Sequence, residues 1–342
     1  SDVYKRQHHS SDAIPLLPKE FEDELMDQTT LVEMANKNYE NAIIIQKILV
    51  LAPLPQKIKI ISKFMNYAEH VLYNRHACLV AAQIVQEGFV DIGVGKVTQA
   101  AIRFMELAHS ITQGWGSFCA QLLVSMTNPH ANHSLKAWFR LLTFKAWGKN
   151  EAEMRTSDHK KINLLIDTIL DVIREHLPQV LIDCCGIRMV TGVIEFCAHS
   201  SNRSLILQTH TNVRAILDAL VSQDTVVTYM KSPYANYAII EAIDFRFVEI
   251  FNVVTENFLD FALDKHANYT LQKCFKVAKD KGDLEIDGQP VKPFEVLCHC
   301  FHKHQFQIHT SNNSVFTSLS IIVASNPKPK LGKARRSKEK GL

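Results

Sequence analysis

The sequence predicts an all-α solenoid of about seven helical repeats. Two observations predict it: one short pattern recurs along the chain, and the copies follow amphipathic stretches of helical period. The clearest copy is DKHANYTLQKCF from Asp264, and its opening recurs as SPYANY from Ser232, NPHANH from Asn128 and NRHACL from Asn74. Recurrence at roughly 20 to 50 residues is typical of solenoids, in which each repeat buries its apolar face against the next.

The recurring pattern predicts the start of a helix. Each clear copy opens with Asn, Ser or Asp and has alanine three positions later. The opening side chain can accept hydrogen bonds from the first-turn amides, and proline is tolerated directly after it, as at Pro129 and Pro233. Weaker copies are DCCGIR from Asp183, KNYENA from Lys37 and HTSNNSVF near His309.

A first helix is expected before each of these starts. The apolar residues of 247–261 recur at spacings of three, four and seven, which is the stripe of one helix. Ser117 to Met126 is interpreted in the same way. The polar inserts Gly148 to Lys161, His199 to Asn212 and Lys279 to Pro293 are predicted to be loops between helices, and no strand alternation persists.

Asn268, Tyr269 and Gln272 form the most informative group, because residues four apart lie on one helix face. The two amides would present hydrogen-bond donors and acceptors side by side, and the tyrosine ring offers a stacking surface worth roughly 1 to 3 kcal/mol per base. With Lys273 and Cys274, this segment resembles the signature of the Pumilio (PUF) RNA-binding family. The resemblance covers roughly residues 35–325.

The resemblance implies a curved right-handed superhelix whose concave face of second helices holds single-stranded RNA, one base per repeat. In that family the first and fifth signature residues touch the edge of one base, and the second stacks between bases. By this analogy Asn268, Tyr269 and Gln272 are expected to read a uracil.

The other repeats depart from the signature. Asn236 and Tyr237 match, but the fifth residue is Ile240, which can donate nothing to a base. Asn132 and His133 match in kind, with Lys136 as a charge that favours phosphate.

The remaining candidate RNA contacts are Arg188 in the fourth repeat, Cys78 in the second and Asn41 in the first. A shift of one residue in the first repeat would bring Gln46 into the fifth position. The last repeat can be aligned on Asn313 or on Ser314.

Two classes of function remain open. The first is a single-stranded RNA binder, with an mRNA 3′ untranslated region as its target and a role in post-transcriptional regulation. Its variant is a nucleolar factor that binds ribosomal precursor RNA with little base specificity. The second class is a protein-interaction scaffold, which apolar residues on the inner surface such as Leu79, Ala82 and Ile240 would suit. In the RNA-binding class, protein partners would bind the convex face.

No catalytic signature is recognisable, so we expect neither an enzyme nor a cofactor. The eight cysteines form no disulfide framework, which indicates a reducing compartment. Cys298 and Cys300, near several histidines, would point to opposite sides of a helix, so no metal site is expected there. Of the adjacent Cys184 and Cys185, one should be buried and the other face the turn.

Three segments are predicted: a disordered or artefactual N-terminus at 1–15, a repeat domain at 16–325 and a basic disordered tail at 326–342. The formal charge is +3, and the tail carries seven lysines and arginines against Glu339. The tail can be a nuclear localisation signal, a phosphate-binding arm or a solubilising segment. We expect a monomer without membrane contact, cytoplasmic or, alternatively, nuclear or nucleolar.

Overall fold

The computed structural model describes residues 28–90, 95–109, 114–147, 157–199, 210–286 and 288–325. The segments predicted at 1–15 and 326–342, and much of the inserts after Gly148 and His199, lie outside these ranges. The chain divides into two compact parts, residues 1–172 and 173–342, and the boundary falls inside helix α10 (Ser157–Glu175).

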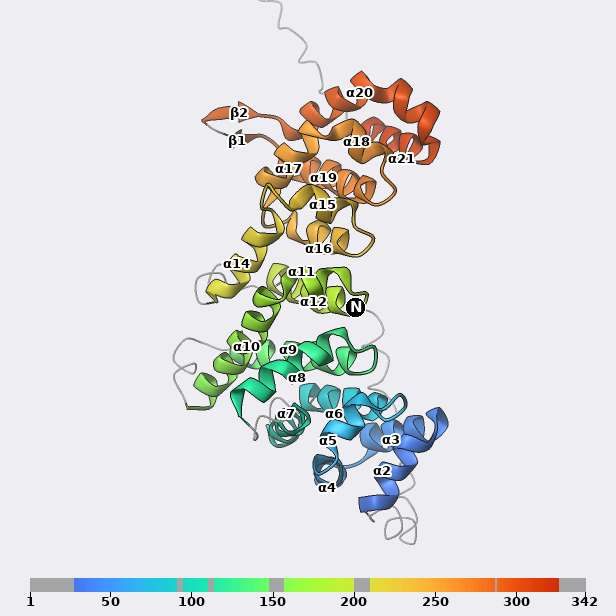
Figure 1. Ribbon diagram of the computed structural model, residues 1–342, viewed down its shortest axis with the longest axis vertical. Helices are drawn as coiled ribbons and strands as arrows, with labels where there is room; N and C mark the ends of the chain where they lie inside the picture. Colours follow the sequence, from blue (N-terminus) through green and yellow to red (C-terminus); the bar gives the residue numbers. More distant parts are fainter. Residues whose placement is uncertain are drawn as a thin grey trace, which may run out of the picture. The chain divides into compact units, whose positions relative to one another are not determined.

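The described residues fold almost entirely into α-helices, as the sequence predicted (Figure 1). Those of the N-terminal part that precede α10 are α2 (Gln28–Lys37), α3 (Tyr39–Leu51), α4 (Leu54–Met65), α5 (Ala68–Tyr73), α6 (Cys78–Val90), α7 (Lys96–Ala108), α8 (Trp115–Thr127) and α9 (Ala131–Trp147). Within this part α3 packs against α6, and α6 packs against α9.

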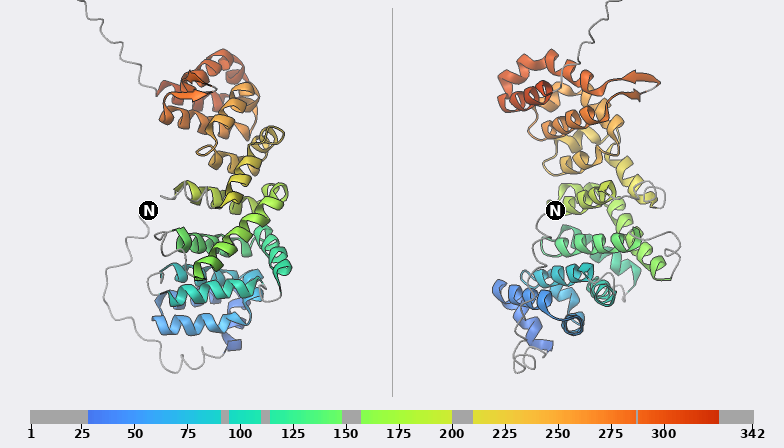
Figure 2. Two further views of the ribbon diagram at one scale, coloured as in Figure 1. Left: turned by 90° about the vertical axis from the view of Figure 1, so that its left-hand side faces the viewer. Right: turned by 180° about the vertical axis from the view of Figure 1, so that it is seen from behind.

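The C-terminal part is also built from successive packed helices (Figure 1, Figure 2). After α10 come α11 (Leu177–Ile182), α12 (Gly186–His199), α14 (Thr211–Leu220), α15 (Val226–Lys231), α16 (Ala235–Ala242), α17 (Phe247–Glu256), α18 (Phe258–Leu263), α19 (Ala267–Lys281), strands β1 (Leu284–Ile286) and β2 (Gln289–Val291), α20 (Pro293–Ser311) and α21 (Asn313–Ala324). Here α12, α16, α19 and α21 pack in series.

The predicted helix starts are confirmed, and the last helix of every repeat begins at a side-chain cap. We call these seven helices the capped helices: α3, α6, α9, α12, α16, α19 and α21. Asp264 Oδ1, for example, accepts hydrogen bonds of 2.8 Å from the N–H groups of both His266 and Ala267. The same pair of bonds is made by Asn74, Asn128, Asp183 and Ser232. Because these bonds satisfy amides that lack partners within the helix, they fix where each capped helix begins.

The small residue three positions after the cap lies where the capped helix approaches the helix before it. Ala77, Ala131, Ala235 and Ala267 are fully buried there. The fourth repeat has Gly186 instead, and a Cβ at this residue would lie 2.5 Å from the carbonyl oxygen of Val180. The two helices of this repeat therefore lie too close together for an alanine at position 186.

The structure corrects two predictions about the elements. The apolar stripe of residues 247–261 is two helices, α17 and α18, which are separated at Asn257, where the side chain donates to the Val253 carbonyl at 2.9 Å. The insert from Lys279 to Pro293 contains the antiparallel hairpin β1–β2, with Leu284 opposite Val291, rather than only a loop. Gly288 has a φ of +74°, a backbone conformation that glycine adopts without steric cost.

Apolar side chains from both parts fill the interiors, with Phe64, Phe104 and Trp138 fully buried in the N-terminal part and Phe261 and Phe275 in the C-terminal part. None of the described helices has the length and apolar character needed to cross a membrane.

Candidate nucleic-acid interface

Positions within a repeat are counted here from its cap residue, which is position 0. The signature residues Asn268, Tyr269 and Gln272 then occupy positions 4, 5 and 8 after Asp264. The cap of the first repeat is Asn38, whose side chain accepts from the Asn41 N–H at 2.8 Å. The cap of the last repeat is Asn312, which accepts from Val315 N–H at 3.3 Å.

These caps decide the alignments that the sequence left open. Asn41, which was predicted to contact a base, lies at position 3, where five of the other repeats have alanine or glycine. The shifted alignment holds, and Gln46 occupies position 8. In the last repeat neither Asn313 nor Ser314 lies at a signature position; Phe316, Thr317 and Ser320 do. The sequence signal for this alignment is Asn312, an asparagine that precedes the buried Val315 by three residues.

Exposure follows position with high regularity across the repeats. Position 4 is buried in all repeats but the last, namely at Ala42, Cys78, Asn132, Ile187, Asn236 and Asn268. Position 5 is exposed at His133, Arg188, Tyr237, Tyr269 and Thr317, and half-buried at Ile43 and Leu79. Position 8 is half-buried throughout, at Gln46, Ala82, Lys136, Thr191, Ile240, Gln272 and Ser320. A molecule resting on the capped helices therefore meets positions 5 and 8.

Asn132, Asn236 and Cys78, which were predicted to face a base, lie at the buried position 4. Asn132 and Asn236 are 1% and 2% exposed, so neither offers a surface to a ligand. Their amide groups donate to main-chain carbonyls instead, Asn132 to Met126 at 2.7 Å and Asn236 to His266 at 3.3 Å. Cys78 is also buried, which raises the pKa of its thiol.

The side chain of Gln46 at position 8 also donates to a main-chain carbonyl. Its Nε2 donates to the Leu79 carbonyl at 2.7 Å, which joins the first capped helix to the second. Gln46 therefore lies at a base-reading position, but its N–H group serves the contact between repeats. The Asn236 amide at position 4 does the same through its bond to the His266 carbonyl.

Asn268 and Gln272 lie side by side, as predicted, but they have different exposures. Asn268 is 5% exposed, and its Nδ2 donates to the Asp264 carbonyl at 2.8 Å. Its Oδ1 accepts from Gln272 Nε2 at 3.0 Å. Asn268 therefore orients the half-buried Gln272, whose Oε1 and second N–H remain available for the edge of a base.

Flat side chains occupy position 5 on three consecutive capped helices of the C-terminal part. They are Arg188 on α12, Tyr237 on α16 and Tyr269 on α19, and each helix packs against the next. Tyr237 and Tyr269 are 57% and 58% exposed, so more than half of each side chain is open to a ligand. Phenol rings and a guanidinium plane are the surfaces on which unpaired bases stack.

The surroundings of these side chains differ from repeat to repeat. Ile240 and Thr191 occupy position 8 beside Tyr237 and Arg188 and are half-buried, so Gln272 is the one carboxamide at this position among the described residues of the C-terminal part. Lys273 follows it, half-buried, with its Nζ 3.9 Å from an Asp244 carboxylate oxygen.

In the N-terminal part, His133 is exposed and Lys136 half-buried on α9. The preceding capped helix, α6, carries the half-buried Leu79 and Ala82 at the same positions. The flat and polar side chains of the predicted site are thus concentrated from the third repeat onward.

Known proteins share both the repeat and the fold. Residues 257–281, which contain Asn268, Tyr269 and Gln272, match the Pumilio-family RNA binding repeat. The solved structure of PUF-8 in complex with PBE-RNA is 11% identical, with 91% of this chain and 87% of that chain covered and a TM-score of 0.52. One stretch of the chain is thus similar to a Pumilio-family repeat, and most of the chain shares the fold of that solved structure.

A double mutant of Puf4 bound to a Cox17 RNA 3′ UTR recognition sequence is also similar to this chain. The identity is 13%, the alignment covers 90% of this chain and 92% of that chain, and the TM-score is 0.53. At these identities the comparison establishes the shared fold of helical repeats. None of the curated proteins compared with the sequence matches it.

Proposed function

We propose that this protein binds single-stranded RNA across the capped helices, with its base contacts concentrated on Arg188, Tyr237, Tyr269 and Gln272. The observation that carries the proposal is the exposed row of flat side chains at position 5 on α12, α16 and α19. Successive bases would stack on these side chains. Stacking tolerates every base, because each base has a π-face.

Gln272 supplies base selectivity in this proposal. Its Oε1 can accept from the N3–H of uracil while its second Nε2 hydrogen donates to a uracil carbonyl, and the bond to Asn268 holds the amide in place. Ile240 and Thr191 present no such amide, so discrimination in the fourth and fifth repeats would be weaker.

The proposed biological role is post-transcriptional control of mRNA, in which the protein recruits other factors to a short element or covers it. Two solved proteins of the same fold are bound to RNA, and one of these RNAs is a 3′ UTR recognition sequence. The shared fold supports an RNA target of that class here. Ribosomal precursor RNA is the alternative target, and it would require backbone contacts without base preference.

The proposal predicts that Tyr237→Ala combined with Tyr269→Ala weakens RNA binding. Loss of one stacking partner costs about 1 to 3 kcal/mol, or roughly 5- to 150-fold in Kd, and the two changes together should exceed either alone. Fluorescence anisotropy with a labelled random-sequence RNA oligonucleotide at fixed salt measures the change.

Tyr234→Ala is the matched control. Tyr234 is an exposed tyrosine of the same repeat as Tyr237, but it lies in the turn before α16. It should leave Kd within about twofold of wild type. Equal weakening by all three substitutions, or none by the double variant, would contradict stacking at position 5. Absence of any RNA binding by wild type would favour the protein-interaction scaffold.

A further inference from the structure

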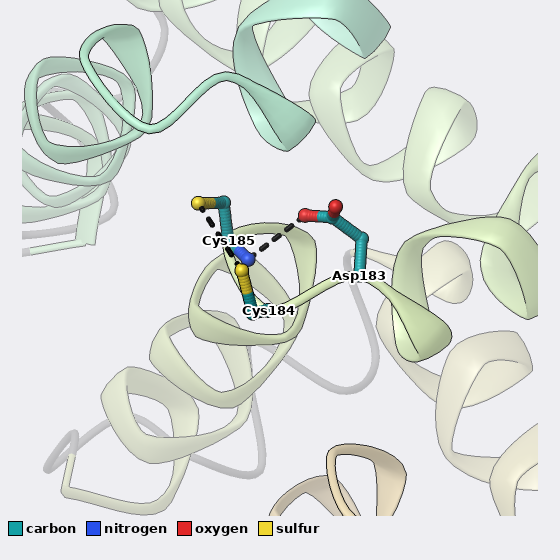
Figure 3. A group of neighbouring side chains, drawn as sticks. All are labelled: Asp183, Cys184 and Cys185. Carbon is teal, nitrogen blue, oxygen red and sulfur yellow. Dashed lines mark hydrogen bonds between the residues drawn. The ribbon is translucent and has the colours of Figure 1, made fainter.

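Asp183, Cys184 and Cys185 bring three metal-ligating side chains together at the start of α12 (Figure 3). One ligand atom from each lies within 4.8 Å of the others, and the two sulfur atoms are 3.9 Å apart. Among the residues that the structure describes, this is the one group of histidine, cysteine and acidic side chains with such convergence. None of the three belongs to the row of flat side chains at position 5.

The separation of the sulfur atoms fits a metal dithiolate. At a metal–sulfur distance of about 2.3 Å, tetrahedral coordination places two thiolate sulfurs about 3.8 Å apart. Cys184 and Cys185 therefore hold this spacing before any ion binds. The spacing is too long for a disulfide, which requires about 2 Å, and in the absence of an ion it matches a thiol–thiol hydrogen bond.

The third ligand is already oriented by the cap. Asp183 Oδ1 accepts hydrogen bonds from the N–H groups of Cys185 at 2.8 Å and Gly186 at 2.7 Å. Hydrogen bonds to a ligating carboxylate fix its direction, as outer-shell partners do in metal sites. Figure 3 shows the carboxylate and both thiols around the first turn of α12.

The exposures of the two thiols allow an ion to enter and to be retained. Cys184 is exposed and Cys185 is buried, as the sequence predicted for this adjacent pair. An ion can reach Cys184 from solvent while Cys185 holds it against the apolar interior. Thiolate ligands select soft and borderline cations such as Zn²⁺ over Mg²⁺ or Ca²⁺.

We propose that Asp183, Cys184 and Cys185 bind one thiophilic divalent cation of the zinc class, with water as the fourth ligand. Binding displaces both thiol protons and forms two metal–sulfur bonds and one metal–oxygen bond. The three ligand charges and the divalent ion leave one net negative charge, the same as ionised Asp183 beside two neutral thiols. Metal binding would thus fix the start of the helix that carries Arg188 without changing its local charge.

The site is tested on the full-length, reduced, metal-free protein by titration with Cd²⁺, which gives thiolate-to-metal charge-transfer absorption in the near ultraviolet. We expect saturation at one equivalent and displacement by Zn²⁺. Cys184→Ser should remove at least about half of the absorption and weaken binding about tenfold or more, because it deletes one of two thiolates. No absorption from wild type would overturn the proposal.

A matched control is the double variant Cys298→Ser, Cys300→Ser, which removes two half-buried cysteines from α20. It should bind Cd²⁺ as wild type does. Loss of the absorption in this variant, or full wild-type absorption in Cys184→Ser, would place the thiolate site elsewhere. Asp183→Asn keeps an oxygen for the cap and removes the charge, so unchanged circular dichroism with about tenfold weaker binding is expected. Unchanged affinity would exclude the carboxylate as a ligand and overturn the three-residue site.

Discussion

At the scale of single residues, His109 shows how a polar group is kept in the interior of the N-terminal part. Its Nδ1 lies 2.8 Å from the Met105 carbonyl oxygen and its Nε2 lies 3.0 Å from Ser125 Oγ. The ring stacks on Trp138, with centroids 5.4 Å apart. Complete burial lowers the pKa of His109 to about 4, against which the bond to Met105 acts weakly, so the ring is neutral at pH 7.

The lowered pKa makes stability depend on acid. Because the unfolded chain has an ordinary histidine pKa near 6.5, the stabilising contribution is complete above that value and is lost as pH falls toward 4. Between pH 7.5 and 4.5 this loss should reduce the free energy of unfolding by roughly 2 to 3 kcal/mol. Urea unfolding at both pH values should show this loss in wild type and not in His109→Gln.

His299→Gln provides the control for His109, since His299 is an exposed histidine on α20. Its pH dependence should equal that of wild type. If His109→Gln loses as much stability between the two pH values as wild type does, the acid sensitivity arises from other groups.

The contrast between Asn268 and Gln272 shows what sequence could predict of the site. The spacing of four correctly predicted two neighbouring amides on one face. The spacing could not predict which of the two amides is exposed. The exposure depends on how closely neighbouring capped helices pack around the residues at position 4. Only the packed structure distinguishes the residue that orients from the residue that can contact a base.

At the scale of elements, the caps determine the alignment of the repeats. They were predictable because Asn, Ser and Asp satisfy first-turn amides by a local interaction, which depends little on the rest of the fold. The division between α17 and α18 was not predictable in the same way, since the apolar stripe continues across Asn257 on the same buried side. In the sequence an Asp-Gly pair separates the two strands of the hairpin β1–β2, which is a favoured hairpin signal that the polar composition of the insert obscured.

Removal of one cap should destabilise its repeat. Asp264→Ala leaves the first-turn amides of α19 without the two bonds that Asp264 Oδ1 accepts, and we expect a loss of about 1 kcal/mol in the free energy of unfolding. Urea denaturation measures it. Asp280→Ala, at an exposed acidic residue near the other end of α19, should change stability by less than about 0.5 kcal/mol. Equal effects of the two substitutions would mean that general charge, rather than capping, stabilises the helix.

At the scale of the whole molecule, the seven repeats share one architecture but not one surface chemistry. Position 5 is flat or charged on α9, α12, α16 and α19, whereas α6 presents Leu79. The repeat architecture was predictable, because cap, small residue and amphipathic helices recur together. The distribution of binding chemistry was only partly predictable, because the signature marks positions that some repeats use for packing, as Asn132, Asn236 and Gln46 do.

We propose that the side chains at position 5 stack bases and that Gln272 selects one of these bases. Selection from a random RNA pool, performed in parallel with wild type and Gln272→Ala, is the decisive test. Gln305→Ala, at an exposed glutamine on α20, is the control. We expect wild type and Gln305→Ala to enrich the same short element with a uracil at one position. Gln272→Ala should enrich that element without the uracil requirement, whereas an unchanged uracil requirement in Gln272→Ala, or no enriched element from wild type, would contradict the claim.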